Sequence, residues 1–309
     1  MKQGAPEPIA ALNRIKILET GEPLVDIRDA CPGVQMREEA CPFLRARVAE
    51  MLNRAQDALP AGYRFRVGTA LRTLSMQRKG WDGYFAQMRE AHPEWPVSAL
   101  RRATNRFFAP YDQPAPPGHC TGGAVDVVLL GPDGEPVDVT SPLEGWAAAY
   151  TWSDRLREES RRNRMLIVEA MLGAGFSNCR EEYWHYSWGD SAWAVRVGEK
   201  TCSYGWAAAP PLVEARHTGG LAHEIRRLDE ATWACSALDG EIDIAVLWHE
   251  GREVEIRLEV HRGDSLFSST DRKTWAEVSV ERSNGALAIR LAPQAPRVYL
   301  RSRPLEESR

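Results

Sequence analysis

The sequence predicts an α+β fold, in which a small antiparallel sheet packs with helices, followed by a separate all-β domain. Two observations predict this division. Up to about residue 208, several stretches have apolar residues at helical spacing, and short apolar runs lie between them. Beyond that point only short alternating runs remain, at roughly ten-residue spacing. We therefore expect a first domain over residues 1–208 and a β-rich domain over residues 209–309.

Several stretches of the first domain have a clear helical or strand pattern. Helices are predicted where apolar residues recur every three or four positions, over residues 43–59, 74–91, 97–107 and 154–172. Residues 63–68 alternate apolar and basic side chains, which predicts a half-buried strand. Residues 124–130 are apolar apart from Asp126, which predicts a buried strand with one inward carboxylate. Because burying a lone carboxylate is costly unless it is paired or binds a metal, Asp126 indicates a site.

The C-terminal domain is predicted from alternating runs separated by turn residues. These runs are EIDIAVLW, EVEIRLEVH, WAEVSVE, ALAIRLA and RVYLRS. Such spacing is typical of a small antiparallel β domain. The segment 207–211, AAAPP, indicates a linker before it. Residues 269–275 resemble an Asp-box hairpin shortened by one residue, and their single occurrence favours a plain hairpin turn.

Composition excludes some classes of partner and favours a reducing compartment. The chain of 309 residues is 43% hydrophobic and 27% charged with net charge −4, so charge gives no reason to expect nucleic acid or an anionic membrane as partner. No apolar run is long enough to span a membrane, and the first twenty residues lack the apolar core of a secretory signal. We expect a cytoplasmic protein with reduced thiols. Cys31 and Cys41 are the one pair of cysteines close enough in sequence to consider a disulfide.

Two short motifs together contain two imidazoles and two carboxylates. The first runs from Gly118 to Asp126 and includes His119, and its glycines allow a tight fold. The second, Glu182-Tyr-Trp-His185, needs a bend to bring its two polar residues to one site, because on a flat strand they would point to opposite faces. Catalytic zinc usually takes three nitrogen or oxygen ligands from the protein. His119, Asp126 and His185 fit that number, and Glu182 is then left as a general base.

Each motif taken alone also fits a role without chemistry. His119 fits a hydrogen-bonded loop histidine, and the pair Glu182 and His185 fits an aromatic strand with solvent-facing charge. The occurrence of both motifs, with an apolar helix between them, favours the zinc site over these alternatives. A further stretch, His217 to Glu224, is similar to the first motif but lacks the aspartate, and we expect it to be structural.

These residues resemble the zinc D-alanyl-D-alanine dipeptidases and the related D,D-carboxypeptidases. His119 to Asp126 matches the HxxGxAxD signature of that family, and Glu182 to His185 matches its ExWH signature. Arg72, which follows a predicted strand, falls where the family has its catalytic arginine. Residues 25–28, VDIR, are similar to an N-terminal segment of the family, and the resemblance extends over about residues 20–205.

The resemblance implies a cofactor, a mechanism and a substrate. One zinc ion per chain would be held by His119, Asp126 and His185 and would lower the pKa of its water. Glu182 would take the proton of that water, and Arg72 would stabilise the oxyanion. The implied substrate is a small peptide, most of all a D-Ala-D-Ala-type dipeptide.

The sequence departs from the family pattern around the zinc motifs. Pro117 stands where the family has serine. The family also has an aspartate before the turn that carries the arginine, and the local sequence here, TALR ending at Arg72, lacks it. With one residue deleted in a turn, Glu144 occupies the position of the aspartate that binds the substrate's ammonium group. Glutamate is longer and would seat the amine differently. The departures therefore concern substrate specificity more than hydrolysis.

Two alternative functions remain open from the sequence. One is a D,D-carboxypeptidase or peptidoglycan endopeptidase, which binding of the C-terminal domain to the cell wall would favour. The C-terminal domain could instead bind a protein ligand. The second is a non-catalytic zinc-binding or interaction module, although the presence of both Glu182 and Arg72 speaks against it.

Overall fold

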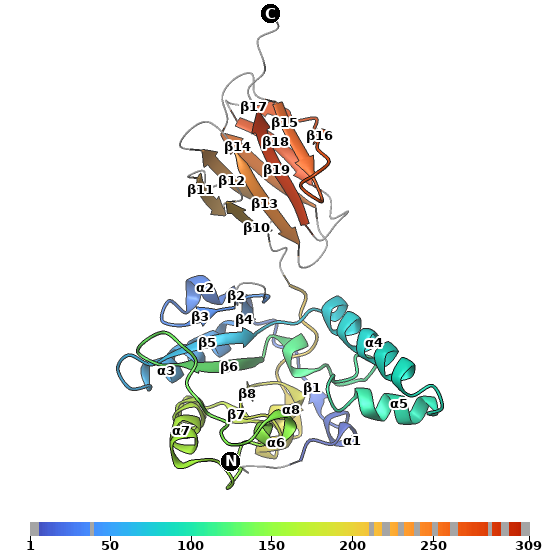
Figure 1. Cartoon of the computed structure of the whole chain (residues 1–309), viewed down its shortest axis with the longest axis vertical. Helices are drawn as coiled ribbons and strands as arrows, with labels where there is room; N and C mark the ends of the chain where they lie inside the picture. The colour runs from blue at the N-terminus through green and yellow to red at the C-terminus, as the bar shows by residue number, and fades with distance from the viewer. Residues whose placement is uncertain are drawn as a thin grey trace, which may run out of the picture. The chain divides into compact units, whose positions relative to one another are not determined.

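A computed structural model of the chain divides into two compact units, Met1–Ala208 and Ala209–Arg309 (Figure 1). The residues that the structure describes are 6–37, 40–209, 213–217, 223–227, 232–237, 242–248, 253–259, 265–283, 286–291 and 297–303. Residues 210 and 211 of the expected linker lie outside them.

The first unit is organised around a five-stranded sheet with the order β3-β5-β6-β8-β7. Its strands are β3 (Gln35–Met36), β5 (Arg64–Thr69), β6 (Ala124–Leu130), β8 (His185–Ser187) and β7 (Ser177–Asn178). Strands β3 and β5 are parallel, and the other neighbours are antiparallel. The predicted strands over residues 63–68 and 124–130 are β5 and β6, two of the three inner strands, and the predicted α+β class is confirmed.

Alternation along β6 gives the sheet two different faces. Val125, Val127 and Leu129 are fully buried and belong to the main hydrophobic core. Helices α3 (Ala46–Asp57) and α7 (Glu158–Gly173) contribute their apolar faces to the same core. Because successive side chains of a strand point to opposite faces, Asp126 lies on the face away from this core. The predicted inward carboxylate therefore faces a site, not the apolar interior.

Helices α4 (Leu74–Ala91) and α5 (Val97–Thr104) lie side by side at one end of the sheet (Figure 1). Thr73 caps α4 by accepting a hydrogen bond from the backbone N–H of Met76. The ring of Trp81 stacks on Phe85 and meets Tyr111 edge-on, which joins α4 to the segment after α5. All four helices predicted from the sequence are present, with ends shifted by up to a few residues.

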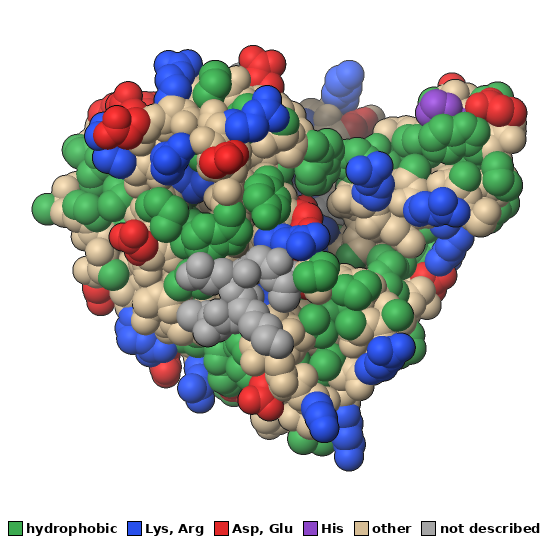
Figure 2. Space-filling view, turned by 90° about the horizontal axis from the view of Figure 1, so that it is seen from below, with side chains coloured by type: hydrophobic (Ala, Val, Ile, Leu, Met, Phe, Trp, Pro, Cys, Tyr) green, Lys and Arg blue, Asp and Glu red, His purple; other side chains and the backbone are tan. Residues whose placement is uncertain are grey.

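Short elements complete the first unit. Two small sheets pair β1 (Lys16–Ile17) with β9 (Thr201–Cys202) and β2 (Leu24–Asp26) with β4 (Phe43–Arg45). The remaining helices are α1 (Ile9–Leu12), α2 (Ile27–Ala30), the 3₁₀ helix η1 (Gly118–Thr121), α6 (Gly145–Ala149) and α8 (Ser191–Val197). Figure 2 shows a face that is hollowed near its middle, where acidic and basic side chains meet within a hydrophobic surround.

The second unit is a β-sandwich, which confirms the predicted all-β class. One sheet has the order β10 (Val213–His217), β13 (Asp243–Trp248), β19 (Arg297–Arg303), β15 (Ser265–Ser269) and β16 (Ala276–Glu277). The other has the order β11 (His223–Arg227), β12 (Thr232–Ala237), β14 (Val254–Glu259), β18 (Ala286–Leu291) and β17 (Glu281–Ser283). Buried aliphatic side chains of both sheets, such as Val246 and Ile256, form one core.

The structure also bears on the shortened Asp-box, on the cysteines and on membrane-spanning helices. Asp271 accepts hydrogen bonds from the backbone N–H groups of Lys273 and Thr274 between β15 and β16, so the shortened Asp-box is a hairpin turn, as predicted. None of the six cysteines forms a disulfide, so a bond between Cys31 and Cys41 is excluded. Among the described residues, no helix has the length and apolar character needed to cross a membrane.

Candidate active site

The pairing of β6 with β8 places Asp126 directly opposite His185. The antiparallel register runs from Ala124 opposite Ser187 to Asp126 opposite His185. Side chains of such a cross-strand pair lie on the same face about 5 Å apart at Cβ. Here the carboxylate Oδ1 and the imidazole Nδ1 are 2.9 Å apart. Two residues that are far apart in sequence thus meet because of strand register alone.

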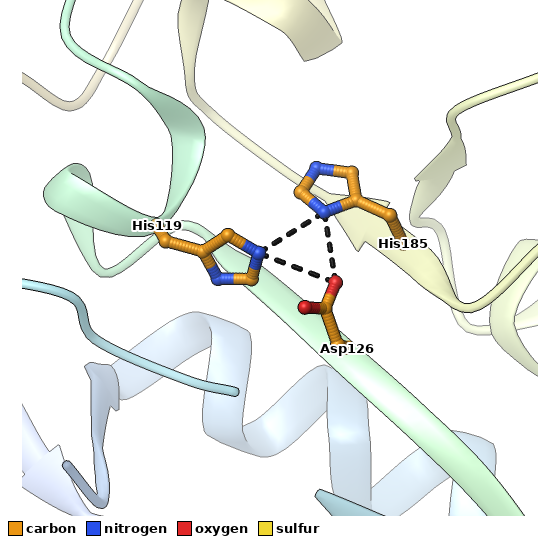
Figure 3. Close-up of side chains that lie close together, drawn as sticks. All are labelled: His119, Asp126 and His185. Carbon is orange, nitrogen blue, oxygen red and sulfur yellow. Dashed lines mark hydrogen bonds and ion pairs between the residues drawn. The ribbon is translucent and has the colours of Figure 1, made fainter. Parts of the chain in front are cut away.

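His119 joins this pair from η1, the turn that leads into β6. Its Nε2 lies 3.1 Å from His185 Nδ1 and 3.2 Å from Asp126 Oδ1 (Figure 3). The three side chains are largely buried, with 9%, 12% and 18% of the His119, His185 and Asp126 side chains exposed. Three atoms that can bind a metal ion, one from each of three elements, therefore lie close together.

The donor atoms fit a zinc ion. A tetrahedral zinc with bonds of about 2.0–2.1 Å holds its ligands about 3.3 Å apart, close to the three distances here. His119 Nδ1 lies 2.9 Å from the carbonyl oxygen of Ala70, so the proton of this ring belongs on Nδ1 and Nε2 offers its lone pair. Two imidazole nitrogens and one carboxylate oxygen are the ligand set typical of catalytic zinc, with a fourth position left open.

Backbone groups and two further polar side chains hold the three side chains in place. The N–H of Arg72 donates to the carbonyl of His119, so the segment after β5 supports this residue at two points. Arg45 Nε donates to the carbonyl of Thr121 at 2.9 Å, and Asn178 Nδ2 donates to the carbonyl of His185 at 3.2 Å. Arg45 and Asn178 could not be predicted, because nothing in their local sequence signals a contact with the motifs.

The glycines of the first motif are required by the fold. Gly122 has φ +71°, and a Cβ there would lie 2.6 Å from Leu24 Cδ2. A Cβ on Gly123 would lie 2.7 Å from the carbonyl oxygen of Trp188. The first position needs left-handed backbone, and the second needs close approach of two chains. Together they let the chain turn from His119 into β6.

A turn brings Glu182 and His185 to the same region, as the sequence required. The N–H of His185 donates to the carbonyl of Glu182 at 3.1 Å, just before β8 begins. Burial raises the pKa of the Glu182 carboxyl, His185 lowers it, and the charge of Asp126 raises it again, with a net rise. A carboxyl group with a raised pKa is suited to accept and return a proton near neutral pH.

The cluster also perturbs its own members. Burial alone would raise the pKa of Asp126, but the charge of His119 and hydrogen bonds from both imidazoles hold it well below its usual value. For His185, burial lowers the pKa, and the hydrogen bond and charge of Asp126 outweigh this and raise it. Asp126 is therefore a carboxylate throughout the neutral range and supplies the negative charge of the site.

The other two predicted residues, Arg72 and Glu144, are not members of this cluster. Arg72 is half-buried, and its Nη1 donates to Gln77 Oε1 at 3.0 Å, while Gln77 donates to the carbonyl of Ala109 at 2.6 Å. Gln77 is fully buried and thus fixes the guanidinium. Glu144 is exposed at the N-terminus of α6 and makes no capping hydrogen bond there, and no described contact joins it to the cluster.

Two further features of the sequence do not belong to the three-residue cluster. The stretch from His217 to Glu224 includes residues 218–222, which lie outside the described residues, so its expected structural role stays a prediction. Pro117 is the residue before η1, where its ring is compatible with the start of a helical turn.

Comparisons with known proteins identify a family and a curated relative. The family described as D-Ala-D-Ala dipeptidase matches residues 40–203, which is more than half of the chain. A curated relative, the D-alanyl-D-alanine dipeptidase of Synechocystis sp., is 28% identical over 228 residues, which are 62% of this chain and 92% of the relative.

Similar solved structures include two zinc or metal peptidases. The vancomycin-resistance D,D-pentapeptidase VanY, in a mutant form in complex with Zn(II), is 16% identical with a TM-score of 0.33, over 60% of this chain and 96% of that one. A metallo-carboxypeptidase from Burkholderia cenocepacia is 14% identical with a TM-score of 0.24 over 29% of this chain. This chain spans only 28% of the length of that carboxypeptidase.

Gly122→Ala should destabilise the protein and weaken its hold on zinc. Left-handed backbone costs an L-residue about 1–2 kcal/mol, and here the new methyl group also meets Leu24. Gly198→Ala is the matched control, because Gly198 has φ +84° and a Cβ added there would have nothing within 4 Å. Thermal unfolding and zinc titration should show a larger loss for Gly122→Ala. Equal unfolding free energies and equal zinc affinity would contradict the packing described.

Zinc affinity should fall steeply as the pH is lowered. Zinc binds neutral imidazole, and the raised pKa of His185 means that protons compete for this ring at higher pH than they do for free imidazole. The apparent affinity should fall on the order of tenfold per pH unit below that pKa. Titration against a chelator, corrected for the chelator's own protonation, measures this. A constant affinity between about pH 6 and 8 would contradict the ligand assignment.

Proposed function

The chain belongs to the D-Ala-D-Ala dipeptidase family, and from this premise we propose that it hydrolyses a small D-Ala-D-Ala-type dipeptide with Glu182 as general base. Family membership confirms the resemblance seen in the two motifs and makes the protein a zinc metallopeptidase of the D,D-dipeptidase or D,D-carboxypeptidase type. The proposal goes further, to the substrate and to the role of each residue.

One observation carries the proposal, namely the convergence of His119 Nε2, His185 Nδ1 and Asp126 Oδ1 beside the Glu182 carboxyl. These three atoms would hold the zinc ion. When bound, zinc supplies a Lewis acid that acidifies water and polarises a carbonyl group. The remaining chemistry belongs to the side chains around it.

Glu182 would move the protons of the reaction. Its carboxylate takes a proton from the attacking water and, as a carboxylic acid, delivers that proton to the nitrogen of the leaving amine. Burial supports both steps, because it raises the pKa of the carboxyl. The pKa of Glu182 then lies closer to the pKa values of the groups with which it exchanges protons. The backbone hydrogen bond between His185 and Glu182, and the electrostatic coupling of the Glu182 carboxyl to His185, Asp126 and His119, support this role.

Arg72 would stabilise the negative charge that develops on the peptide carbonyl oxygen. Gln77 holds one N–H group of the guanidinium and so orients the others. Since Gln77 is itself held by the carbonyl of Ala109, this orientation exists before substrate binds. A pre-oriented donor needs no reorganisation during the reaction.

Glu144 would bind the free ammonium group of the dipeptide. Its carboxylate is exposed and makes no capping hydrogen bond to α6, which leaves it available to a cationic group. The curated relative is a dipeptidase, which supports a substrate with a free amine close to the scissile bond. The longer side chain of glutamate at this position would shift the amine and alter the preference among dipeptides.

Glu182→Gln should abolish hydrolysis while zinc remains bound. The amide keeps the size of the side chain but cannot accept the proton of water, so kcat should fall by about 10²–10⁴-fold. The control is Glu181→Gln, since Glu181 is exposed and forms an ion pair with Arg180. Hydrolysis of D- and L-configured dipeptides should be followed together with zinc content. Activity near that of the unaltered protein, at equal zinc content, would contradict the assignment.

A further inference from the structure

Arg164 is a buried guanidinium in the middle of α7. Its residue exposure is 1%, and within the described part of the chain its hydrogen-bond partners are backbone carbonyls. Burial lowers the pKa of this arginine, and the negative charge of Asp138 acts only in part against that. A buried charge without an ion-pair partner is costly, so other contacts must compensate it.

The guanidinium is satisfied by backbone carbonyls of one segment, residues 138–151, which we call the wall segment. Nε donates to the carbonyl of Val139 at 2.9 Å, Nη1 to that of Tyr150 at 2.7 Å and Nη2 to that of Ala148 at 2.7 Å. One rigid fork therefore fixes the beginning and the end of the wall segment relative to each other.

Neighbouring residues of α7 and the segment's own first residue hold its start. Asp138 accepts hydrogen bonds from the N–H groups of Thr140 and Ser141 and from Ser160 Oγ. Asn163 Nδ2 donates to the carbonyl of Asp138 at 2.9 Å. The start of the wall segment is thus attached to α7 by several hydrogen bonds, and Arg164 also donates two hydrogen bonds to its far end.

The far end of the wall segment adjoins the turn that carries Glu182. The N–H of Tyr183 donates to the carbonyl of Ala149 at 2.9 Å, and the N–H of Thr151 donates to the carbonyl of Arg180 at 2.9 Å. Arg164 also lies over the ring of Tyr183, with its central carbon 4.3 Å from the ring centroid. The same guanidinium thus contacts the wall segment and the residue next to the proposed base.

The middle of the wall segment extends toward the side of the site that holds Arg72. Trp146 is 49% exposed, and its ring meets that of Phe107 edge-on at 5.0 Å. Phe107 lies two residues before Ala109, whose carbonyl holds Gln77 and through it Arg72. The wall segment therefore connects the supports of the two proposed catalytic side chains, and it carries Glu144.

We propose that Arg164 is a positioning residue, which fixes the wall segment against the turn of Glu182 and so sets where a substrate amine meets the site. This inference rests on the proposed function for its effect on substrate, while the fixation of the segment can be measured without any substrate. Lysine cannot replace the arginine. The planar guanidinium reaches three separate carbonyl groups at once, which a single ammonium group cannot do.

The test compares Arg164→Lys with Arg162→Ala, a change on the same helix at an exposed arginine paired with Glu158. Arg164→Met serves as a second variant, since it removes the buried charge and keeps an unbranched side chain. Hydrogen exchange followed by mass spectrometry reports on residues 139–151 and 180–184. Zinc content, KM and kcat for a hydrolysed dipeptide are measured on the same samples.

The expected result is faster exchange in residues 139–151 and 180–184, with unchanged exchange in α3 and β6 and unchanged zinc content. KM should rise on the order of tenfold with a smaller change in kcat, because the metal ligands stay in place. Arg162→Ala should change none of these quantities. Unchanged exchange in the wall segment of both Arg164 variants, or a uniform increase across the first unit with unchanged KM, overturns the proposal. If no dipeptide is hydrolysed by the unaltered protein, the proposed function fails, and the exchange data still decide whether Arg164 fixes the segment.

Discussion

The site depends on one constraint, the register between β6 and β8, which sets Asp126 opposite His185. A shift of β8 by one residue would turn His185 to the hydrophobic face and bring Tyr186 opposite Asp126 instead. That shift is prevented by the core itself, because Val125 and Tyr186 are fully buried there. The apolar packing on one face of the sheet therefore fixes the chemistry on the other.

His119 is held differently, by backbone groups of the segment that follows β5. The carbonyl of Ala70 orients its ring, and the N–H of Arg72 binds its carbonyl. The proposed oxyanion residue thus belongs to the segment that holds His119, a proposed metal ligand, so that a change in either would move the other. This coupling is typical of zinc sites, where groups that contact the ligands fix the ring orientation and the donor nitrogen.

The sequence predicted the helices, two of the inner strands and the two motifs, because these features depend on local periodicity and residue type. Helix ends were less well predicted: α7 begins at Glu158, after a turn, and not at residue 154. The contacts of Arg45, Asn178 and Arg164 could not be predicted, since each is made to a backbone carbonyl that has no signature in sequence. Such contacts arise only when distant segments are packed together, and a lone arginine in a helix predicts a solvated surface by default.

The most direct measurement of the central claim is X-ray absorption at the zinc edge, made on the purified protein with its zinc content determined. The account predicts one zinc ion per chain with nitrogen and oxygen neighbours only at about 2.0–2.1 Å, including two imidazoles. It also predicts that Asp126→Ala loses most of this zinc, because the carboxylate is the only negative charge among the three proposed ligands. A sulfur neighbour at about 2.3 Å, or full zinc content in Asp126→Ala, would contradict the site formed by His119, Asp126 and His185.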